Sequence, residues 1–189
     1  MMSTSIPNDH PLRHLFRSLV ERSFLHYLRW DDLHVTSYIS ELLLKFIDID
    51  RLYTIRNRNG DQVGTVIEML YESDVLLEAS SFEREQEVHQ HIGDFTLFMG
   101  GIFPQHLRRI KSSGMIHHGD FLIDYIRTGK RSYSIAAEYK DHPPKANTSA
   151  WQKLSDNFEL CVVGLDHVRS TLDHMQESRY LQVRQHLMH

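Results

Sequence analysis

The amino-acid sequence predicts an all-α fold, organised as a single-domain bundle of five to seven helices. Apolar residues recur at helical spacing in several long segments, and most of these segments begin near a residue that commonly caps helices. Only 9 Gly and 5 Pro occur in 189 residues, too few to supply the turns of a many-stranded β protein. The hydrophobic fraction of 41% and the charged fraction of 24% are typical of a globular domain.

The predicted domain spans residues 10–175. Residues 1–9 are expected to form a flexible N-terminal lead, and residues 176–189 a polar C-terminal tail or loose helix. The polar start of the chain lacks the apolar stretch of a secretory signal, and the single cysteine, Cys161, excludes an intramolecular disulfide. No run of about 20 apolar residues is present, so no membrane span is expected. These features predict a cytoplasmic protein.

The first two predicted helices follow this lead. Pro11 fits the first turn of a helix over residues 11–28, which has one apolar face and one mildly basic face. We interpret the basic face as solvated, with attachment to an acidic partner or an anionic lipid surface as the alternative. Asp31 or Asp32 can cap the next helix, over residues 33–47, and its broad apolar face predicts a central position.

Residues 52–66 allow two interpretations. Two short apolar runs around a turn at Asn59-Gly60 are compatible with a β-hairpin. The apolar spacing of residues 63–70 instead favours a helix with Asp61 as its N-cap. We favour a short extended piece followed by a helix, and the hairpin stays open as the alternative.

The longest predicted helix begins near Ser80. Ser80 and Glu83 have the spacing of a capping box, in which each side chain accepts from the backbone N–H of the other residue. The helix should end near the pair Gly100-Gly101, after which Pro104 redirects the chain.

Two further long helices complete the predicted bundle. One covers about residues 120–137, and the other runs from Thr148 or Ser149 to about residue 172. Three positions on the apolar face of the first are small, which implies close approach by a neighbouring helix: Gly129, Ala136 and Ala137.

One polar cluster lies near the apolar stripe of the helix that begins at Ser80. On a helical wheel, Arg84, Glu87, His91 and Asp94 lie on this stripe or at its edge. Buried charges without partners are costly, so these side chains are expected to pair. The preferred interpretation is a structural network in which Arg84 pairs with Glu87, and His91 lies between Glu87 and Asp94.

The alternative interpretation of this cluster is a metal site. Glu87 and His91 are four residues apart and share one face of a helix, and Asp94 follows one turn later. Nitrogen and oxygen ligands of this kind suit iron, manganese or zinc, as in an oxidase or oxygenase. The Glu-x-x-His motif of di-iron carboxylate bundles is absent, and so is His-Glu-x-x-His. No cofactor is expected in the preferred interpretation.

No motif in the sequence specifies a reaction, since Gly-x-Ser-x-Gly, P-loop and dinucleotide-binding patterns are absent. The leading hypothesis is a non-enzymatic protein that binds a protein partner or self-associates. The run Leu42-Leu43-Leu44 motivates it, because such broad apolar faces can exceed what one small core covers. A metal-binding protein is the alternative, and a small-molecule sensor with a pocket near the glycine pair is a third.

The formal net charge of −4 gives no general reason to bind nucleic acid. The 14 histidines predict a gain of positive charge at about pH 6.

Overall fold

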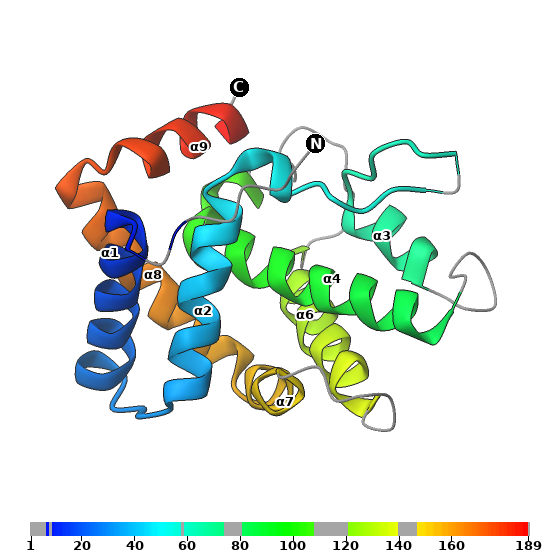
Figure 1. Cartoon of the computed structure of the whole chain (residues 1–189), viewed down its shortest axis with the longest axis horizontal. Coiled ribbons are helices and arrows are strands. Elements are labelled where there is room, and N and C mark those ends of the chain that lie inside the picture. The colour runs from blue at the N-terminus through cyan, green and yellow to red at the C-terminus, as the bar shows by residue number, and fades with distance from the viewer. Residues whose placement is uncertain are drawn as a thin grey trace.

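The computed structural model describes residues 7, 9–57, 59–73, 81–107, 121–139 and 147–188, and these are mostly helical (Figure 1). The elements are α1 (Pro11–Glu21), the π-helix η1 (Arg22–Tyr27), α2 (Leu33–Phe46), the 3₁₀-helix η2 (Ile49–Arg51), α3 (Val66–Ser73), α4 (Phe82–Ile102), α6 (Phe121–Glu138), α7 (Thr148–Asp156), α8 (Phe158–Met175) and α9 (Ser178–Met188). No β-strand occurs among the described residues, which confirms the all-α prediction. None of these helices is long and apolar enough to cross a lipid bilayer.

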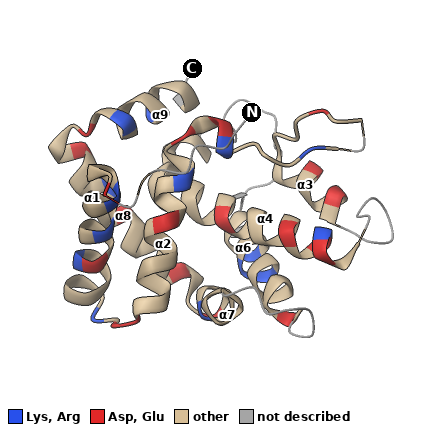
Figure 2. Cartoon of the chain, in the orientation of Figure 1, with Lys and Arg blue, Asp and Glu red and all other residues tan. Residues whose placement is uncertain are grey.

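The helix α4 lies at the centre of the described structure. In Figure 1 it runs across the middle of the molecule, and it packs most extensively on α6, with further contacts to α8, α3 and α2. Every residue from 91 to 103 is buried, so this part of α4 is enclosed on all sides. The charged side chains of α4 gather toward its N-terminal half (Figure 2).

The first two helices begin at the predicted residues, but residues 42–44 do not form the exposed apolar face from which association was predicted. Pro11 is the first residue of α1, and Asp32 caps α2, since its Oδ1 accepts hydrogen bonds from the backbone N–H of His34 and Val35. The run of residues 42–44, which suggested a surplus apolar face, lies entirely in the core. It is covered because α2 packs on α1, α4 and α7 rather than on a single neighbour. Of the predicted lead, residues 1–6 and 8 lie outside the described residues.

The segment between α2 and α3 combines features of both interpretations. A turn with Gly60 at φ +85° brings Arg56 and Gln62 together in an isolated antiparallel bridge, but no strands extend from it. The helix α3 follows, as favoured. Asp61 is not its cap: Thr65 and Glu68 form a capping box, in which the Thr65 hydroxyl accepts from the Glu68 N–H and the Glu68 carboxylate accepts from the Thr65 N–H.

The start of α4 lies one residue later than predicted. Ser81 is the N-cap, with its hydroxyl oxygen 3.2 Å from the Arg84 backbone nitrogen. Ser80 lies outside the described residues. The helix ends at Ile102, close to the predicted position. Gly101 faces α8 so closely that a Cβ there would lie 2.4 Å from Leu165, so this position admits a packed helix and not a ligand.

The close helix approach predicted from small residues is confirmed at Gly129 on α6. A Cβ at Gly129 would lie 2.4 Å from both the Phe158 ring and the Thr96 hydroxyl. Ala136 and Ala137 are also buried.

The C-terminal part contains more helices than predicted. Thr148 begins α7, but the helix breaks at Asn157, whose backbone leaves the helical region, and Phe158 begins α8. Residues 178–188, expected to be a tail or loose helix, form α9 with buried side chains at Tyr180 and Val183. For these reasons the helices outnumber the predicted five to seven.

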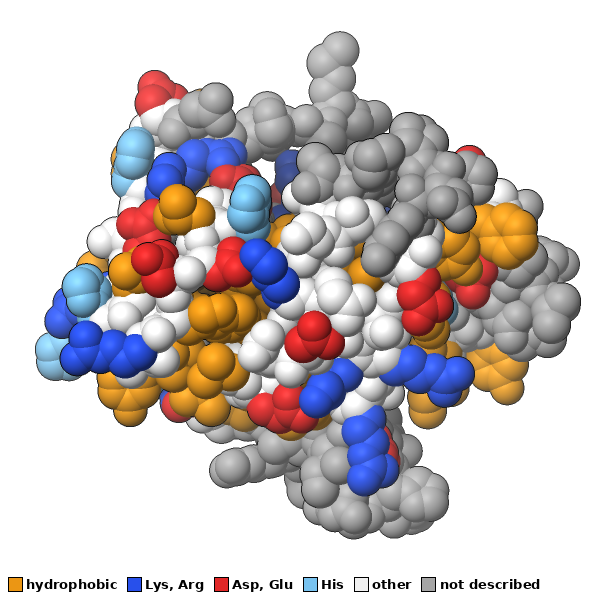
Figure 3. Space-filling model, turned by 90° about the horizontal axis from the view of Figure 1, so that it is seen from below, with side chains coloured by type: hydrophobic (Ala, Val, Ile, Leu, Met, Phe, Trp, Pro, Cys, Tyr) orange, Lys and Arg blue, Asp and Glu red, His pale blue; other side chains and the backbone are white. Residues whose placement is uncertain are grey.

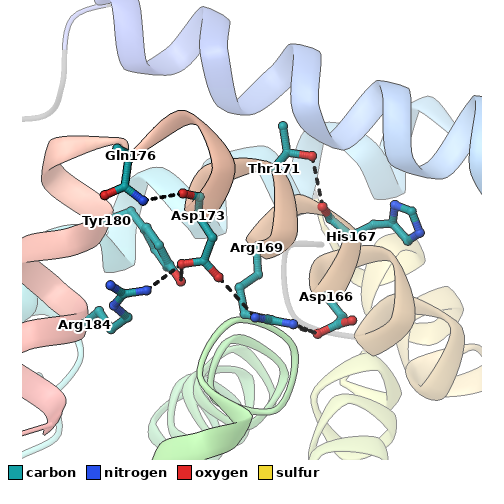
Figure 4. Close-up of polar contacts among 8 residues, drawn as sticks. All are labelled: Asp166, His167, Arg169, Thr171, Asp173, Gln176, Tyr180 and Arg184. Atoms are coloured by element: carbon teal, nitrogen blue, oxygen red, sulfur yellow. Dashed lines mark hydrogen bonds and ion pairs between the residues drawn. The ribbon is translucent and has the colours of Figure 1, made fainter.

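A carboxylate joins α8 to α9 (Figure 4). Asp173 on α8 accepts hydrogen bonds from the Tyr180 hydroxyl at 2.8 Å and from Arg184 at 2.6 Å, both on α9. Its other oxygen accepts from Arg169 at 3.1 Å. This ion-paired junction fixes α9 against the rest of the chain.

Candidate functional site

The buried half of α4 holds one acidic side chain, Asp94, which is only 2% exposed. Its Oδ1 accepts hydrogen bonds from the Tyr38 hydroxyl at 2.6 Å and from the Tyr133 hydroxyl at 2.8 Å. Its Oδ2 lies 3.3 Å from the Nζ of Lys45. One carboxylate therefore joins α4 to α2 and α6, and three donors compensate for its removal from water.

Close backbone packing places the Tyr133 hydroxyl on Asp94. The Tyr133 ring lies directly over Gly93, where a Cβ would be 2.7 Å from the ring. Because Gly93 has no side chain, α6 approaches α4 closely enough for the fully buried Tyr133 to reach the carboxylate of the next residue. A glycine thus precedes the key aspartate for a steric reason.

A second layer of donors orients Tyr38. Its hydroxyl oxygen accepts from the indole N–H of Trp151 at 2.9 Å and from the Gln90 amide at 3.4 Å, while its hydrogen is donated to Asp94. Burial first, and then the Asp94 charge, raise the pKa of Tyr38 and of Tyr133 well above the ordinary tyrosine value. Both phenols therefore stay protonated and act as hydrogen-bond donors.

An open cavity of about 470 Å³ lies beside this network. Its lining comes from α2, from α4 and from the residue before α7: Leu33, His34, Ser37, Tyr38, Glu41, Leu42, Lys45, Gln90, Asp94 and Asn147. Lys45 is a cation of this lining, with 33% of its side chain exposed. Glu41, 57% exposed, is an anion of the same wall and forms an ion pair with Arg13 of α1. The cavity thus presents both signs of charge to a small molecule.

His91 belongs to a separate, structural arrangement. Its Nε2 lies 3.0 Å from the carbonyl oxygen of Leu52 and its Nδ1 lies 3.4 Å from the hydroxyl of Thr54. The rings of Phe46 and Phe95 flank it. Burial, followed by the charge of Lys45, lowers the pKa of His91 to about 4, so the ring is neutral at physiological pH. A neutral ring with Nε2–H donating and Nδ1 accepting satisfies both contacts.

The four predicted site residues are not assembled as expected. Glu87 is exposed on the outer face of α4, and the half-buried Arg84 donates to the backbone carbonyl of Arg56 at 3.2 Å. His91 and Asp94 use the other partners described above. The reason is that the N-terminal half of α4 lies at the surface, where charged side chains reach solvent.

Within the described part of the chain, no group of three or more His, Cys, Asp or Glu side chains is placed to hold a metal ion. Glu87, His91 and Asp94 therefore do not form the predicted ligand set. Binding of iron, manganese or zinc has no support from this geometry and is not part of the function proposed below.

Sequence reasoning identified Asp94 but missed its partners Tyr38, Lys45 and Tyr133, and also Trp151, which donates to Tyr38. They lie on three other helices, and no local spacing connects them to α4. The available signals were indirect. Tyr and Trp carry a polar group that needs a partner when buried, and both types were present in the predicted apolar stripes.

Comparison with known proteins adds no assignment, since no protein-family model, curated protein or solved structure matches this chain.

Proposed function

We propose that this protein is a non-enzymatic, single-domain cytoplasmic protein that binds a small zwitterionic molecule in the cavity between α2, α4 and α7. The observation that carries the proposal is the Lys45–Asp94 ion pair in the lining of that cavity. A volume of about 470 Å³ is within the usual range for small-ligand sites.

The lining favours a polar ligand over an apolar one. An apolar molecule would remove water from Lys45 and Glu41 without replacing its hydrogen bonds, which is unfavourable. A ligand that carries a carboxylate and an ammonium group, such as an amino acid, would supply a partner to each. The carboxylate would contact Lys45, and the ammonium group would contact Glu41.

The same contacts favour binding over catalysis. The lone pairs of Asp94 already accept from three donors, so the carboxylate is a poor base. The two tyrosines are held protonated by burial and by Asp94. Lys45 is the one charged group of the network with a sizeable exposed fraction, and its role is to attract an anion.

Ligand-observed NMR with mixtures of the common amino acids tests this proposal. Ser37 is exposed in the cavity wall, so Ser37→Trp should fill the cavity without disturbing the core. Ser170→Trp is the matched control, since Ser170 is exposed in a different cavity, on α8. We expect saturable binding of at least one amino acid that Ser37→Trp abolishes and Ser170→Trp preserves. Absence of binding across the set, or equal binding by both variants, would refute the proposal.

A second candidate function is self-association through α3, which retains the leading expectation from the sequence. Val66 and Met69 of this helix are buried, while Ile67 and Tyr71 on another face are 66% and 61% exposed. A helix that is apolar on two faces is normally covered on both. A second copy of the chain could cover this face about a twofold axis, with the apolar side chains of the two copies in contact. Its area is small, and since stable interfaces bury about 1,200 Å² or more, the association should be weak.

Light scattering after size exclusion, at high protein concentration, separates this candidate from the first. Ile67→Glu should abolish any dimer, and Val163→Glu is the control at an exposed apolar position of α8. A monomer at every concentration would exclude self-association, and the proposal of amino-acid binding would still stand.

A further inference from the structure

A second cavity, of about 590 Å³, lies between η1 and α8 and is separate from the Asp94 site. Its described lining consists of Leu19, Arg22, Ser23, His26, Tyr27, His167, Ser170, Thr171 and His174. We call it the histidine groove. Among these lining residues are one arginine and three histidines and no carboxylate. Histidine side chains (pale blue) and side chains of the Lys and Arg class (blue) are visible at the left edge of Figure 3, the end of the molecule where α1 and α8 lie in Figure 1.

The acidic residues that adjoin Arg22, His167 and His174 in the sequence form ion pairs with arginines outside the groove lining. On α8, Arg169 binds Asp166 at 2.6 Å and Asp173 at 3.1 Å. Figure 4 shows these three side chains on one side of α8, while Thr171 points to the other side, toward the N-terminal helices. On α1, Glu21 accepts from Arg17 at 2.8 Å. The charged and titratable side chains of the groove's described lining are therefore Arg22, the three histidines and Tyr27.

The walls of the groove are held in place by close packing. The Ser23 hydroxyl donates to the carbonyl oxygen of Gly164 at 2.7 Å, which fixes η1 on α8. A Cβ at Gly164 would lie 2.5 Å from the Phe24 ring, so glycine allows the two elements to meet. The π-helical turn of η1, in which the Leu28 N–H donates to the Ser23 carbonyl, is of a type that often occurs at functional sites.

One wall of the groove is aromatic. The Tyr27 ring lies against the His167 ring, with centroids 3.3 Å apart, and Tyr27 is 59% exposed. These two rings line a cavity whose other side chains can donate hydrogen bonds to an anion. The exposed part of the Tyr27 ring offers an apolar surface for a carbon framework attached to that anion.

We propose that the histidine groove binds a small organic phosphate, that is, a phosphate monoester. Phosphate has three acceptor oxygens, which suits several donors spread around one cavity. Arg22 provides a permanent charge that can bind two oxygens at once, and His26, His167 and His174 provide N–H donors. The Thr171 hydroxyl donates to the carbonyl of His167, so its hydrogen is not available to the ligand. Tyr27 and Leu19 contact the organic part.

Calorimetric titration with phenyl phosphate tests this proposal on the full-length protein. We expect saturable binding that the double variant Arg22→Gln/His167→Gln weakens at least about tenfold, because it removes the permanent charge and one donor. The matched control is Arg179→Gln/His186→Gln, which removes the same side-chain types from exposed positions on α9, outside the groove. Inorganic phosphate should bind more weakly than phenyl phosphate, since it cannot contact Tyr27.

Equal affinity of the groove and control variants, or no saturable binding of phenyl phosphate, would overturn the proposal. Binding to phosphatidylserine vesicles without binding of phenyl phosphate would also overturn it and would point to the basic face of α1.

Discussion

The two halves of α4 differ in the burial of their side chains, although they form one continuous helix. In the first half, residues 82–90, buried and exposed positions alternate as on an amphipathic helix, and Glu87 faces solvent. In the second half, residues 91–102, every residue is buried whatever its position on the wheel. A charged side chain in the first half can reach water, whereas Asp94 in the second half must find all its partners inside the protein. Figure 2 shows the resulting change in charge along the helix.

This difference explains which polar residues organise the core. A helical wheel assumes one buried stripe, and that assumption fails where neighbouring helices enclose α4. The predicted network placed its four members along one stripe across both halves. The protein instead divides them: Arg84 and Glu87 remain near solvent, and His91 and Asp94 bond to other elements. The following predictions test that division, from the largest expected effect to the smallest.

Asp94→Ala should be the most destabilising of these substitutions. It would leave the Tyr38 and Tyr133 hydroxyls and the Lys45 ammonium group without their shared acceptor. Breaking a buried charged network typically costs about 3–5 kcal/mol of the free energy of unfolding. Urea denaturation monitored by circular dichroism measures this loss in the free energy of unfolding. Glu87→Ala, an exposed acid on the same helix, is the control and should change the stability by less than about 0.5 kcal/mol. Equal effects of the two substitutions would show that the halves do not differ.

His91 should make the stability depend on pH in a defined window. Its pKa is about 4 in the folded protein, below the ordinary value of 6.5, so the unfolded chain binds more protons between these values. Stability from this group is therefore complete above about pH 6.5 and falls as the pH decreases toward about 4. The shift corresponds to roughly 3 kcal/mol, given about 1.4 kcal/mol for each pKa unit.

His91→Phe provides the comparison, because a phenyl ring fits between Phe46 and Phe95 but does not titrate. The difference in unfolding free energy between wild type and variant, measured by denaturation across this pH range, should decrease steadily below about pH 6.5. At higher pH the variant should lose about 1 kcal/mol through the missing bond to Leu52. A difference that stays constant with pH would show that His91 is not held neutral.

The sequence was sufficient to predict most of the helical elements, but it did not predict the contacts of Asp94 between them. Periodicity and capping residues predicted the all-α class, a cap at Asp31 or Asp32, a helix start at Thr148 or Ser149 and a helix end near the pair Gly100-Gly101. These features depend on neighbours within a few residues, and the structure has Asp32 as the cap, Thr148 as the start and Ile102 as the end. The close approach at Gly129 was also predictable, since a small residue on an apolar face leaves room for the neighbouring helix. The partners of Asp94 were not predictable, because Tyr38 is 56 positions away and Tyr133 is 39. The break at Asn157 was missed because the apolar stripe continues through it.

Arg84→Ala should have the smallest effect, and it tests the first half of α4 directly. A wheel that places Arg84 on the buried stripe predicts a loss of about 3 kcal/mol, the cost of breaking a buried ion pair. In the structure the side chain is half-buried, and its guanidinium donates to the carbonyl oxygen of Arg56 in an exposed hydrogen bond of 3.2 Å. Water replaces such a bond at little cost, so we expect a loss below about 1 kcal/mol in urea denaturation. Arg84→Lys, which keeps the charge and most of the apolar stem, should be closer still to wild type. A loss of several kcal/mol for Arg84→Ala would mean that the N-terminal half of α4 is as enclosed as the C-terminal half, and the contrast between them would not hold.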